Sequence, residues 1–367
     1  MKTIFLFVTS ILILSSSLVY SQNQDLERYN QDLERYIEVF KKHGEEPVSF
    51  VLNKLNEFDL IIFDDALHNS KNPFDFYQTL VKSSSGEIDY VFIEVFGISA
   101  QKQLDSFVYN SVSDTSILIK AFQDDFSGNG LRYKTYLDLL ETIRVHNISQ
   151  SPQNKIRAVG VDLPVWWEAI KTRMEYDIFL ASLASRDYFM YLSIIEKMNG
   201  FARGKKGIFL TNTRHSYKNI RRKNGELYWN TGTFFNHFNP QRSYSIRFHN
   251  LLLNITGSKA ITGNKSAQGL DRITYSWAQP DDGRWEKAFI ENGEKPIAIP
   301  LKGNIFGKSR YIGNHMLDVA EGETMENAWD AVIFLKTVSK LESTEITNFI
   351  LTPEFEKELA RRKLIIN

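Results

Sequence analysis

Acidic and imidazole side chains follow short apolar runs at several places in this sequence. The residues concerned are Asp65, His68, Glu94, Asp162, His215 and His249. A carboxylate that accepts a ring N–H from a histidine orients the imidazole and raises its basicity, so the second ring nitrogen can take a proton from water or bind a metal ion. These residue types therefore indicate acid–base or metal chemistry.

The elements that must position these side chains are five apolar, β-branched runs. They cover 60–63, 90–93, 156–161, 207–210 and 243–246, with stretches of helical patterning between them. Continuous apolar runs of this length are typical of buried parallel strands. The carboxyl ends of parallel strands meet at one edge of a sheet, where ligands bind. We therefore expect Asp65, His68, Glu94 and His215 to lie within direct or one-water contact.

The loop 64–68, after the first run, contains two carboxylates and a histidine. Asp65 could orient His68, or the carboxylates could bind loop amides while the histidine packs against the sheet. Glu94, after the second run, is costly to bury alone, which leaves open a catalytic role or a structural ion pair with Lys or Arg. Asp162 either joins the cleft or caps the helix that follows.

The segment 211–218 combines hydroxyls, an amide, a guanidinium, an imidazole and a phenol after the fourth run. Arg214 could hold a carboxylate or a developing oxyanion, and His215 could act as an acid, a base or a ligand. The pairing of arginine with histidine recurs after the fifth run, as Arg247 and His249, on one strand face.

The pattern as a whole predicts an α/β protein with a mostly parallel sheet flanked by helices. A single domain is expected over 55–367, after a signal peptide at 1–21 and N-terminal helices at 22–54. The N-terminal helices contain Gln-Asp-Leu-Glu-Arg-Tyr twice with a period of seven, which places Leu33 and Phe40 on one stripe. Such a stripe is typical of a packing surface.

Helical inserts are expected around 115–147 and 165–198. Residues 255–310 have weak periodicity and are interpreted as a long excursion on the surface, before a late strand at 329–335 and a terminal helix. His315 could reach the cleft only if this late loop folds back over the sheet.

The first residues have the pattern of a secretory signal peptide. A basic start, an apolar core of about ten residues and small side chains before Gln22 predict cleavage after Ser21. The apolar core is too short to span a bilayer, which needs about 20 residues. We therefore expect export to the periplasm or the exterior, with no membrane attachment after cleavage. The absence of cysteine excludes disulfides and a lipid-anchored N-terminal cysteine.

Charge and motifs narrow the classes of function. Lys plus Arg equals Asp plus Glu at 44 each, so no overall field attracts nucleic acid, and a small molecule is the expected partner. The sequence has no Gly-rich phosphate loop, no Gly-x-Ser-x-Gly elbow and no His-Glu-x-x-His helix. A standard nucleotide site and a covalent serine mechanism are therefore not supported.

The order of the strand-end motifs resembles that of the erythromycin esterase and ChaN-like superfamily, which includes the TIKI and TraB proteins. The matching stretches are 63–68, 92–94 and 211–215. This resemblance implies ester hydrolysis in one branch, metal-dependent proteolysis in another and haem binding in ChaN. The first motif departs from the family pattern, because Asp65 replaces Glu and two residues separate it from His68.

Three hypotheses of function follow. In the first, the protein is an exported ester or amide hydrolase in which His68 or His215 deprotonates water, Asp65 and Glu94 orient the reacting groups, and Arg214 stabilises the oxyanion. In the second, the hydrolase uses a divalent metal ion bound by His68, Glu94 and either His215 or His249.

The third hypothesis comes from another class of protein, a carrier of haem or a small ligand. His215, Tyr217 or His249 would then coordinate the metal complex, with Arg247 among the binding residues.

Overall fold

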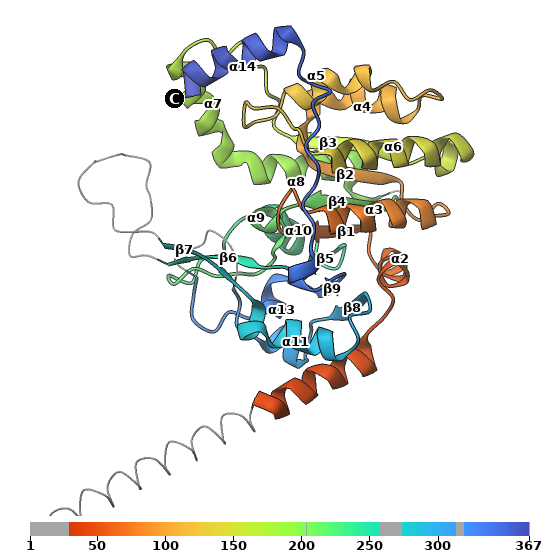
Figure 1. Cartoon of the computed structure of the whole chain (residues 1–367), viewed down its shortest axis with the longest axis vertical. Helices are drawn as coiled ribbons and strands as arrows, with labels where there is room; N and C mark the ends of the chain where they lie inside the picture. The colour runs from red at the N-terminus through yellow and green to blue at the C-terminus, as the bar shows by residue number, and fades with distance from the viewer. Residues whose placement is uncertain (1–28, 203, 257–273, 313–318, 367) are drawn as a thin grey trace, which may run out of the picture.

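The computed structural model describes residues 29–202, 204–256, 274–312 and 319–366 (Figure 1). Its centre is a seven-stranded sheet with the order β3-β2-β4-β1-β5-β9-β8. All neighbouring strands run parallel except β8, which is antiparallel to β9. The predicted fold class is therefore confirmed.

The strands of the sheet are β1 (Leu60–Asp64), β2 (Tyr90–Gly97), β3 (Arg157–Asp162), β4 (Gly207–Thr211), β5 (Ser243–Phe248), β8 (Ile297–Pro300) and β9 (Ala331–Phe334). The first five begin at or next to the predicted apolar runs and β9 lies in the predicted late strand, whereas β8 was not predicted. Strand β2 differs from expectation, because it continues past Ile93 to Gly97 and its register with β3 shifts between these two residues. Glu94 thus lies inside a bulged strand and does not end it, and bulges of this kind re-aim side chains next to active sites.

The strands are apolar on both faces because helices cover both faces. In β1, Ile61 and Phe63 pack into one core, while Leu60 and Ile62 pack into another. The first core is covered by α2 (Pro47–Glu57), α3 (Lys71–Ser83), α4 (Gln101–Val108) and α6 (Lys134–Ser149), and the second by α8 (Arg186–Lys197) and α10 (Thr231–Phe238). Figure 1 shows α3, α4 and α6 side by side. This two-sided burial explains the continuous apolar runs.

Helices occupy both stretches in which helical inserts were expected. The first contains a short helix, α5 (Ile119–Gln123), followed by α6, and the second contains α7 (Arg173–Ser182) followed by α8. The stretch Arg173–Lys197 is apolar and long enough to cross a membrane by length and composition. Here α7 contacts the terminal helix α14 (Pro353–Ile366), and α8 contacts β3.

The N-terminal helix over 29–43 packs against the late part of the chain. Leu33 and Phe40 of the repeated segment lie in one apolar cluster with Phe289 of α11 (Arg284–Glu291). The stripe formed by the repeat is therefore a packing surface, as its spacing indicated. Residues 1–21, where the signal peptide was predicted, lie outside the described residues.

The late stretch contributes more to the core than its weak periodicity suggested. Trp285, Ala288 and Phe289 form a buried face on α11, and β8 extends the sheet. The polar residues around these positions hide the i, i+3, i+4 spacing of the apolar ones. The same stretch holds α12 (Ile305–Lys308) and β7 (Thr274–Ala278), which pairs with β6 (Leu252–Thr256). His315 lies outside the described residues.

Candidate active site

The backbone turns sharply after β1. Ala66 has a φ of 63°, in the left-handed region that residues other than glycine rarely adopt. Its N–H donates to Asp64 Oδ1 at 2.8 Å. The turn brings Asp65 Oδ2 to 3.5 Å from His68 Nδ1. Strained backbone of this kind concentrates at functional sites, and here it forms the acid–imidazole pair that the loop predicted.

Glu94 is the centre of the site. Its side chain is only 1% exposed, and its Oε2 accepts hydrogen bonds from Thr211 Oγ1 and from the N–H of Asn212 at 3.1 Å. Its Oε1 lies 3.3 Å from His215 Nε2 and 3.5 Å from His68 Nε2. His68 and His215 follow different strands, and each therefore points its Nε2 at the same carboxylate oxygen, Glu94 Oε1.

His68 is held at both ring nitrogens. Its Nδ1 lies 3.1 Å from the hydroxyl of Tyr136 on α6, and its Nε2 lies 2.9 Å from Asn212 Nδ2. Asn212 Oδ1 accepts the N–H of Arg214 at 2.9 Å, so the amide of Asn212 directs its NH₂ group at the imidazole. Neutral His68 therefore accepts at Nε2 and carries its proton on Nδ1, facing Asp65.

His215 is more enclosed than His68. It lies in the short helix α9 (Thr213–Ser216) after β4, and its side chain is 6% exposed against 21% for His68. Its Nδ1 is 2.7 Å from Asp187 Oδ1. The same oxygen accepts hydrogen bonds from the N–H and the hydroxyl of Thr231, at 2.8 and 2.9 Å. The orientation of the His215 ring is therefore fixed.

Arg186, at the start of α8, connects the acidic groups of the site. Its Nε and Nη2 each donate to the carboxylate of Asp162 at 2.8 Å, and Nη2 also lies 2.9 Å from Glu94 Oε1. Its Nη1 is 3.4 Å from His215 Nε2. The role of Asp162, which the sequence left open, is therefore to position this guanidinium as well as to accept the N–H of Leu163 at 2.8 Å.

Arg214 lies beside this cluster in the α9 turn and is exposed. Partial desolvation of its guanidinium lowers the pKa of Arg214, and Glu94 and Arg186 are its charged neighbours. It remains a cation at any physiological pH. A cation at the mouth of the site can stabilise negative charge that develops on a bound substrate.

The charges of the cluster shift one another's protonation. Burial lowers the pKa of His68, but the carboxylates of Glu94 and Asp65 outweigh it and raise that pKa to about 10. For His215, Asp187 and Glu94 outweigh burial and raise the pKa to about 9. Burial raises the pKa of Asp65 to about 6. The surrounding carboxylates therefore favour the imidazolium form of both histidines in the free protein.

The pKa of Glu94 shifts in the opposite direction from the pKa of Asp65. Burial alone would raise its pKa, but His215, His68 and Arg186 hold the pKa of this carboxyl well below its ordinary value. Glu94 therefore stays ionised and is the fixed anion of the site, around which the cations are arranged.

The three remaining predicted binding residues lie elsewhere. Arg247 Nη1 is 3.4 Å from Asp64 Oδ2, and both side chains are completely buried. His249 is also buried, with its Nε2 2.7 Å from Glu286 Oε2. Tyr217 packs in the apolar cluster of the N-terminal helix. The structure therefore brings together Asp65, His68, Glu94 and His215, with Arg214 beside them, but not these three residues.

The cluster does not fit a metal ion. Among the described residues, no group of three or more His, Asp or Glu side chains is arranged to hold one. In the predicted set of His68, Glu94 and His215, the guanidinium of Arg186 contacts both Glu94 and His215. A fixed cation thus stands where the metal would be bound.

The predicted haem ligands do not fit either. An axial ligand needs a ring nitrogen or phenol that faces an apolar cavity. Both ring nitrogens of His215 contact neighbouring side chains, and His249 is paired with Glu286. Tyr217 is buried in the apolar cluster of the N-terminal helix.

The sequence analysis missed Arg186, Asp187 and Tyr136. All three lie on helices of the two inserts, and that analysis assigned chemistry only to strand ends. One signal was present: Arg186 and Asp187 are adjacent opposite charges in a stretch otherwise dominated by aromatic residues. A charged pair within an apolar helical segment indicates that the charges have buried partners.

Comparisons with known proteins identify the fold. No family model matches the sequence, and no curated protein matches it significantly. A succinoglycan biosynthesis protein superposes with a TM-score of 0.57 at 10% identity, covering 86% of this chain and 98% of that one. A mutant of the erythromycin esterase EreC in its open conformation superposes with a TM-score of 0.53 at 10% identity, covering 83% and 95%.

A third solved structure, a protein from Bacillus cereus, has a TM-score of 0.52 and 13% identity, covering 86% of this chain and 99% of that one. The TM-scores show a common fold, and at such low identity the activity must be argued from the site. The fold that the predicted resemblance implied is thus confirmed, since an erythromycin esterase is among the structures that superpose.

Proposed function

We propose that the protein is a hydrolase that cleaves ester bonds, with His68 as the general base that activates water. The observation that carries this proposal is the convergence of His68 Nε2 and His215 Nε2 on Glu94 Oε1, at 3.5 and 3.3 Å. A buried anion that faces two imidazoles stabilises the imidazolium that forms when one of them accepts a proton.

His68 is the better base of the two because a substrate can reach it. Its side chain is 21% exposed, whereas His215 is enclosed by Asp187, Glu94 and Arg186. Neutral His68 carries its proton on Nδ1, which Asp65 and Tyr136 face, and the attacking water takes the place of Asn212 Nδ2 at the lone pair of Nε2. His215 is then a positioning residue that helps to hold Glu94.

The reaction proceeds through a tetrahedral intermediate. His68 takes a proton from water, the resulting hydroxide attacks the acyl carbon, and Arg214 stabilises the negative charge on the carbonyl oxygen. The imidazolium of His68 then returns the proton to the leaving alcohol as the C–O bond breaks. The products are a carboxylic acid and an alcohol, and His68 regains its starting state.

The experiment compares two histidines of the same chain. The p-nitrophenyl esters of acetate and butyrate, and the corresponding anilides, are offered to the wild type, to His68→Gln and to His237→Gln. His237 is exposed on α10 and serves as the matched control. We expect ester turnover that falls about 100-fold or more in His68→Gln, the usual contribution of a general base, and stays unchanged in His237→Gln.

Equal rates in the wild type and His68→Gln would refute the base assignment. Turnover of anilides but not of esters would move the activity to amide bonds, and absence of turnover on every substrate would contradict a hydrolase.

We also propose that the hydrolase acts outside the cytoplasm, since residues 1–21 have the pattern of a secretory signal. Expression of the full chain in a bacterium, followed by mass spectrometry of the periplasmic fraction, tests this. We expect a mature protein that begins at Gln22. Uncleaved protein confined to the cytoplasm would contradict export.

A further inference from the structure

Three aromatic side chains form an exposed surface on and beside α10. Trp229 and Phe238 are 45% and 53% exposed, and Phe234 lies between them in the chain, partly buried. The three ring planes lie within 30° of one another, and the ring centroids are 5.1 to 6.1 Å apart. The outer rings of a three-ring column would be about 7 Å or more apart, so no ring is enclosed by the other two. We call Trp229, Phe234 and Phe238 the aromatic platform.

The aromatic platform is held in place before any ligand binds. Next to Trp229, the carbonyl of Tyr228 accepts the hydroxyl of Thr233 at 2.9 Å, and Asn230 Oδ1 accepts the N–H of Thr233 at 2.8 Å. Both chain neighbours of Trp229 are therefore anchored to α10. Phe234 packs against the apolar core that α8 and α10 cover. A surface that is already ordered loses little entropy when a ligand covers it.

The aromatic platform adjoins the candidate active site. Asn230, the residue after Trp229, donates from Nδ2 to the carbonyl of Arg214 at 2.9 Å. The N–H of Thr231 donates to Asp187 Oδ1 at 2.8 Å. A ligand that covers Trp229 therefore lies next to the segment that carries Arg214, the exposed cation of the site.

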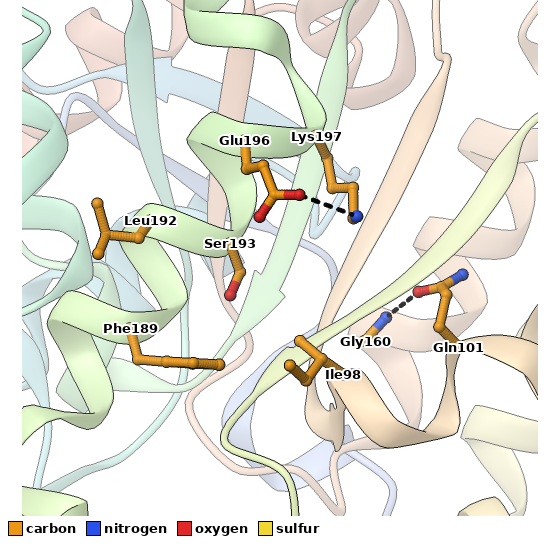
Figure 2. A pocket seen from close by; sticks show the side chains of 8 residues that line it. All are labelled: Ile98, Gln101, Gly160, Phe189, Leu192, Ser193, Glu196 and Lys197. Atoms are coloured by element: carbon orange, nitrogen blue, oxygen red, sulfur yellow. Dashed lines mark hydrogen bonds and ion pairs between the residues drawn. The ribbon is translucent and has the colours of Figure 1, made fainter.

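The charge of the aromatic platform favours a neutral ligand. Farther along α8, a cavity of about 460 Å³ has charged residues in its lining, and Glu196 and Lys197 pair there at 3.6 Å (Figure 2). None of the three platform residues lines that cavity, and none of them is charged. A charged ligand would lose hydration on the platform without gaining a partner of opposite charge.

The exposed shape of the aromatic platform favours a carbohydrate over an apolar ligand. An apolar chain binds in a pocket that buries most of its surface, whereas Trp229 and Phe238 face solvent. A pyranose ring carries apolar C–H groups on its face and hydroxyls along its edge. Its face can therefore cover an aromatic ring while its hydroxyls remain in water.

We propose that the ester cleaved at the candidate active site is carried by a neutral carbohydrate, one pyranose ring of which stacks on Trp229. This inference rests on the proposed hydrolase activity, and it adds the class of alcohol that the reaction releases. The acylated hydroxyl extends past Asn230 toward Arg214, which faces the carbonyl oxygen. Water adds its OH to the acyl carbon, the C–O bond breaks, and the proton passes through His68 to the sugar oxygen.

The first experiment measures binding without hydrolysis. Cellotetraose is the probe, because β-linked glucose has every ring substituent equatorial and therefore C–H groups on both faces. It is titrated into the mature protein by isothermal calorimetry, with sorbitol, a linear polyol, as the control for hydroxyl contacts alone. We expect a Kd of about 1 mM or lower for cellotetraose and no heat of binding from sorbitol at the same concentration of hydroxyl groups.

Variants of one indole assign the binding to the aromatic platform. Trp229→Ala removes the stacking ring and should weaken cellotetraose binding by at least about tenfold, the loss typical of a central aromatic contact. Trp229→Phe keeps a ring and should retain most of the affinity. Trp277, on β7, is 54% exposed, so Trp277→Ala is the matched control and should bind as the wild type does.

The second experiment measures turnover of two acetate esters that differ in their alcohol. Release of acetate is followed from mono-O-acetylated cellotetraose and from ethyl acetate. We expect kcat/KM to be at least about tenfold higher for the sugar ester, because binding energy from a remote part of a substrate lowers the barrier. In Trp229→Ala this preference should disappear.

The two experiments separate the sugar from the hydrolase. Binding of cellotetraose without turnover of either ester would refute the hydrolase and with it the sugar ester. Absence of cellotetraose binding, unchanged binding by Trp229→Ala, or equal kcat/KM for the two esters would refute the sugar and leave the hydrolase standing.

Discussion

Two buried groups of charged residues lie at the carboxyl edge of the same sheet, and they differ in access. The Glu94 cluster consists of Asp65, His68, Glu94, Arg186 and His215. The Arg247 cluster consists of Asp64, Arg247, His249 and Glu286. Both contain an arginine, carboxylates and histidine next to strand ends, so residue type and position along the strand do not distinguish them.

Access and charge balance distinguish the two clusters. His68 is 21% exposed, whereas the side chain of His249 is completely buried. The carboxylates raise the pKa of His68 to about 10 against the effect of burial, while burial outweighs Glu286 and lowers the pKa of His249. A histidine that a substrate can reach, and whose protonated form is stabilised, is suited to proton transfer. The Arg247 cluster is suited to holding the fold together.

The largest effect expected from this comparison is on stability. Arg247→Met leaves the buried Asp64 without its cation, which lies 3.4 Å away, and loss of one partner of a buried pair costs about 3–5 kcal/mol. Urea denaturation should show this loss, while kcat per folded molecule stays at the wild-type value. The double variant Arg247→Met with Asp64→Asn should recover part of the stability. A folded Arg247→Met protein with reduced kcat would place this cluster in the catalytic site.

Removal of the central anion should have the next largest effect. Glu94→Gln keeps the size of the side chain, and Arg186 keeps its two bonds to Asp162. We expect kcat/KM to fall about 100-fold and the pKa values of His68 and His215 to decrease in an NMR titration, because their shared carboxylate charge is gone. Unchanged histidine pKa values would contradict the coupling on which the site is built.

The kind of contact that each residue makes determines whether the sequence could predict its place in this site. The meeting of Asp65, His68, Glu94 and His215 was predictable, because parallel strands bring their carboxyl ends to one edge. The contributions of Arg186 and Tyr136 were not, since the packing of an insert helix onto a strand end depends on tertiary contacts that no local pattern encodes. The bulge at Glu94 was hidden for the same reason.

His249 was predicted to be a binding residue, and it lies outside the Glu94 cluster for a different reason. Arg247 and His249 have the residue types and strand position of the Glu94 cluster, but Glu286, on a helix of the late stretch, pairs with His249. Burial of this kind can be judged only when the covering elements are known, and the late stretch had been interpreted as a surface excursion.

Stability should also depend on pH, because the pKa values of His68 and His215 are raised in the folded protein. The folded-state pKa values are about 10 for His68 and about 9 for His215, against about 6.5 in an unfolded chain. Their contribution is therefore complete below about pH 6.5 and is lost as the pH rises through the folded-state values. The urea midpoint of the wild type should fall between pH 6.5 and pH 10. His215→Asn should show a smaller fall, and His237→Gln a fall equal to the wild type's. A midpoint that rises over this range would contradict the sign.

The smallest effect is expected at Tyr136. Tyr136→Phe removes the hydroxyl that lies 3.1 Å from His68 Nδ1 and leaves the ring packed against Phe74. One hydrogen bond that orients the base is worth about 1 kcal/mol, so kcat/KM should fall about fivefold. Tyr188→Phe, on the exposed face of α8, is the matched control and should have no effect. A loss in Tyr136→Phe as large as that in Glu94→Gln would give Tyr136 a direct part in the chemistry.

The pH dependence of kcat/KM tests the central claim most directly. The accessible His68 must lose its proton before it can accept one from water, and its pKa in the free protein is about 10. We predict that kcat/KM for an ester rises about tenfold per pH unit from neutral pH and levels off near pH 10, since this parameter reports the ionisation of the free enzyme. In Glu94→Gln the same curve should level off at lower pH. A kcat/KM that is flat or falls as the pH rises would contradict His68 as the base.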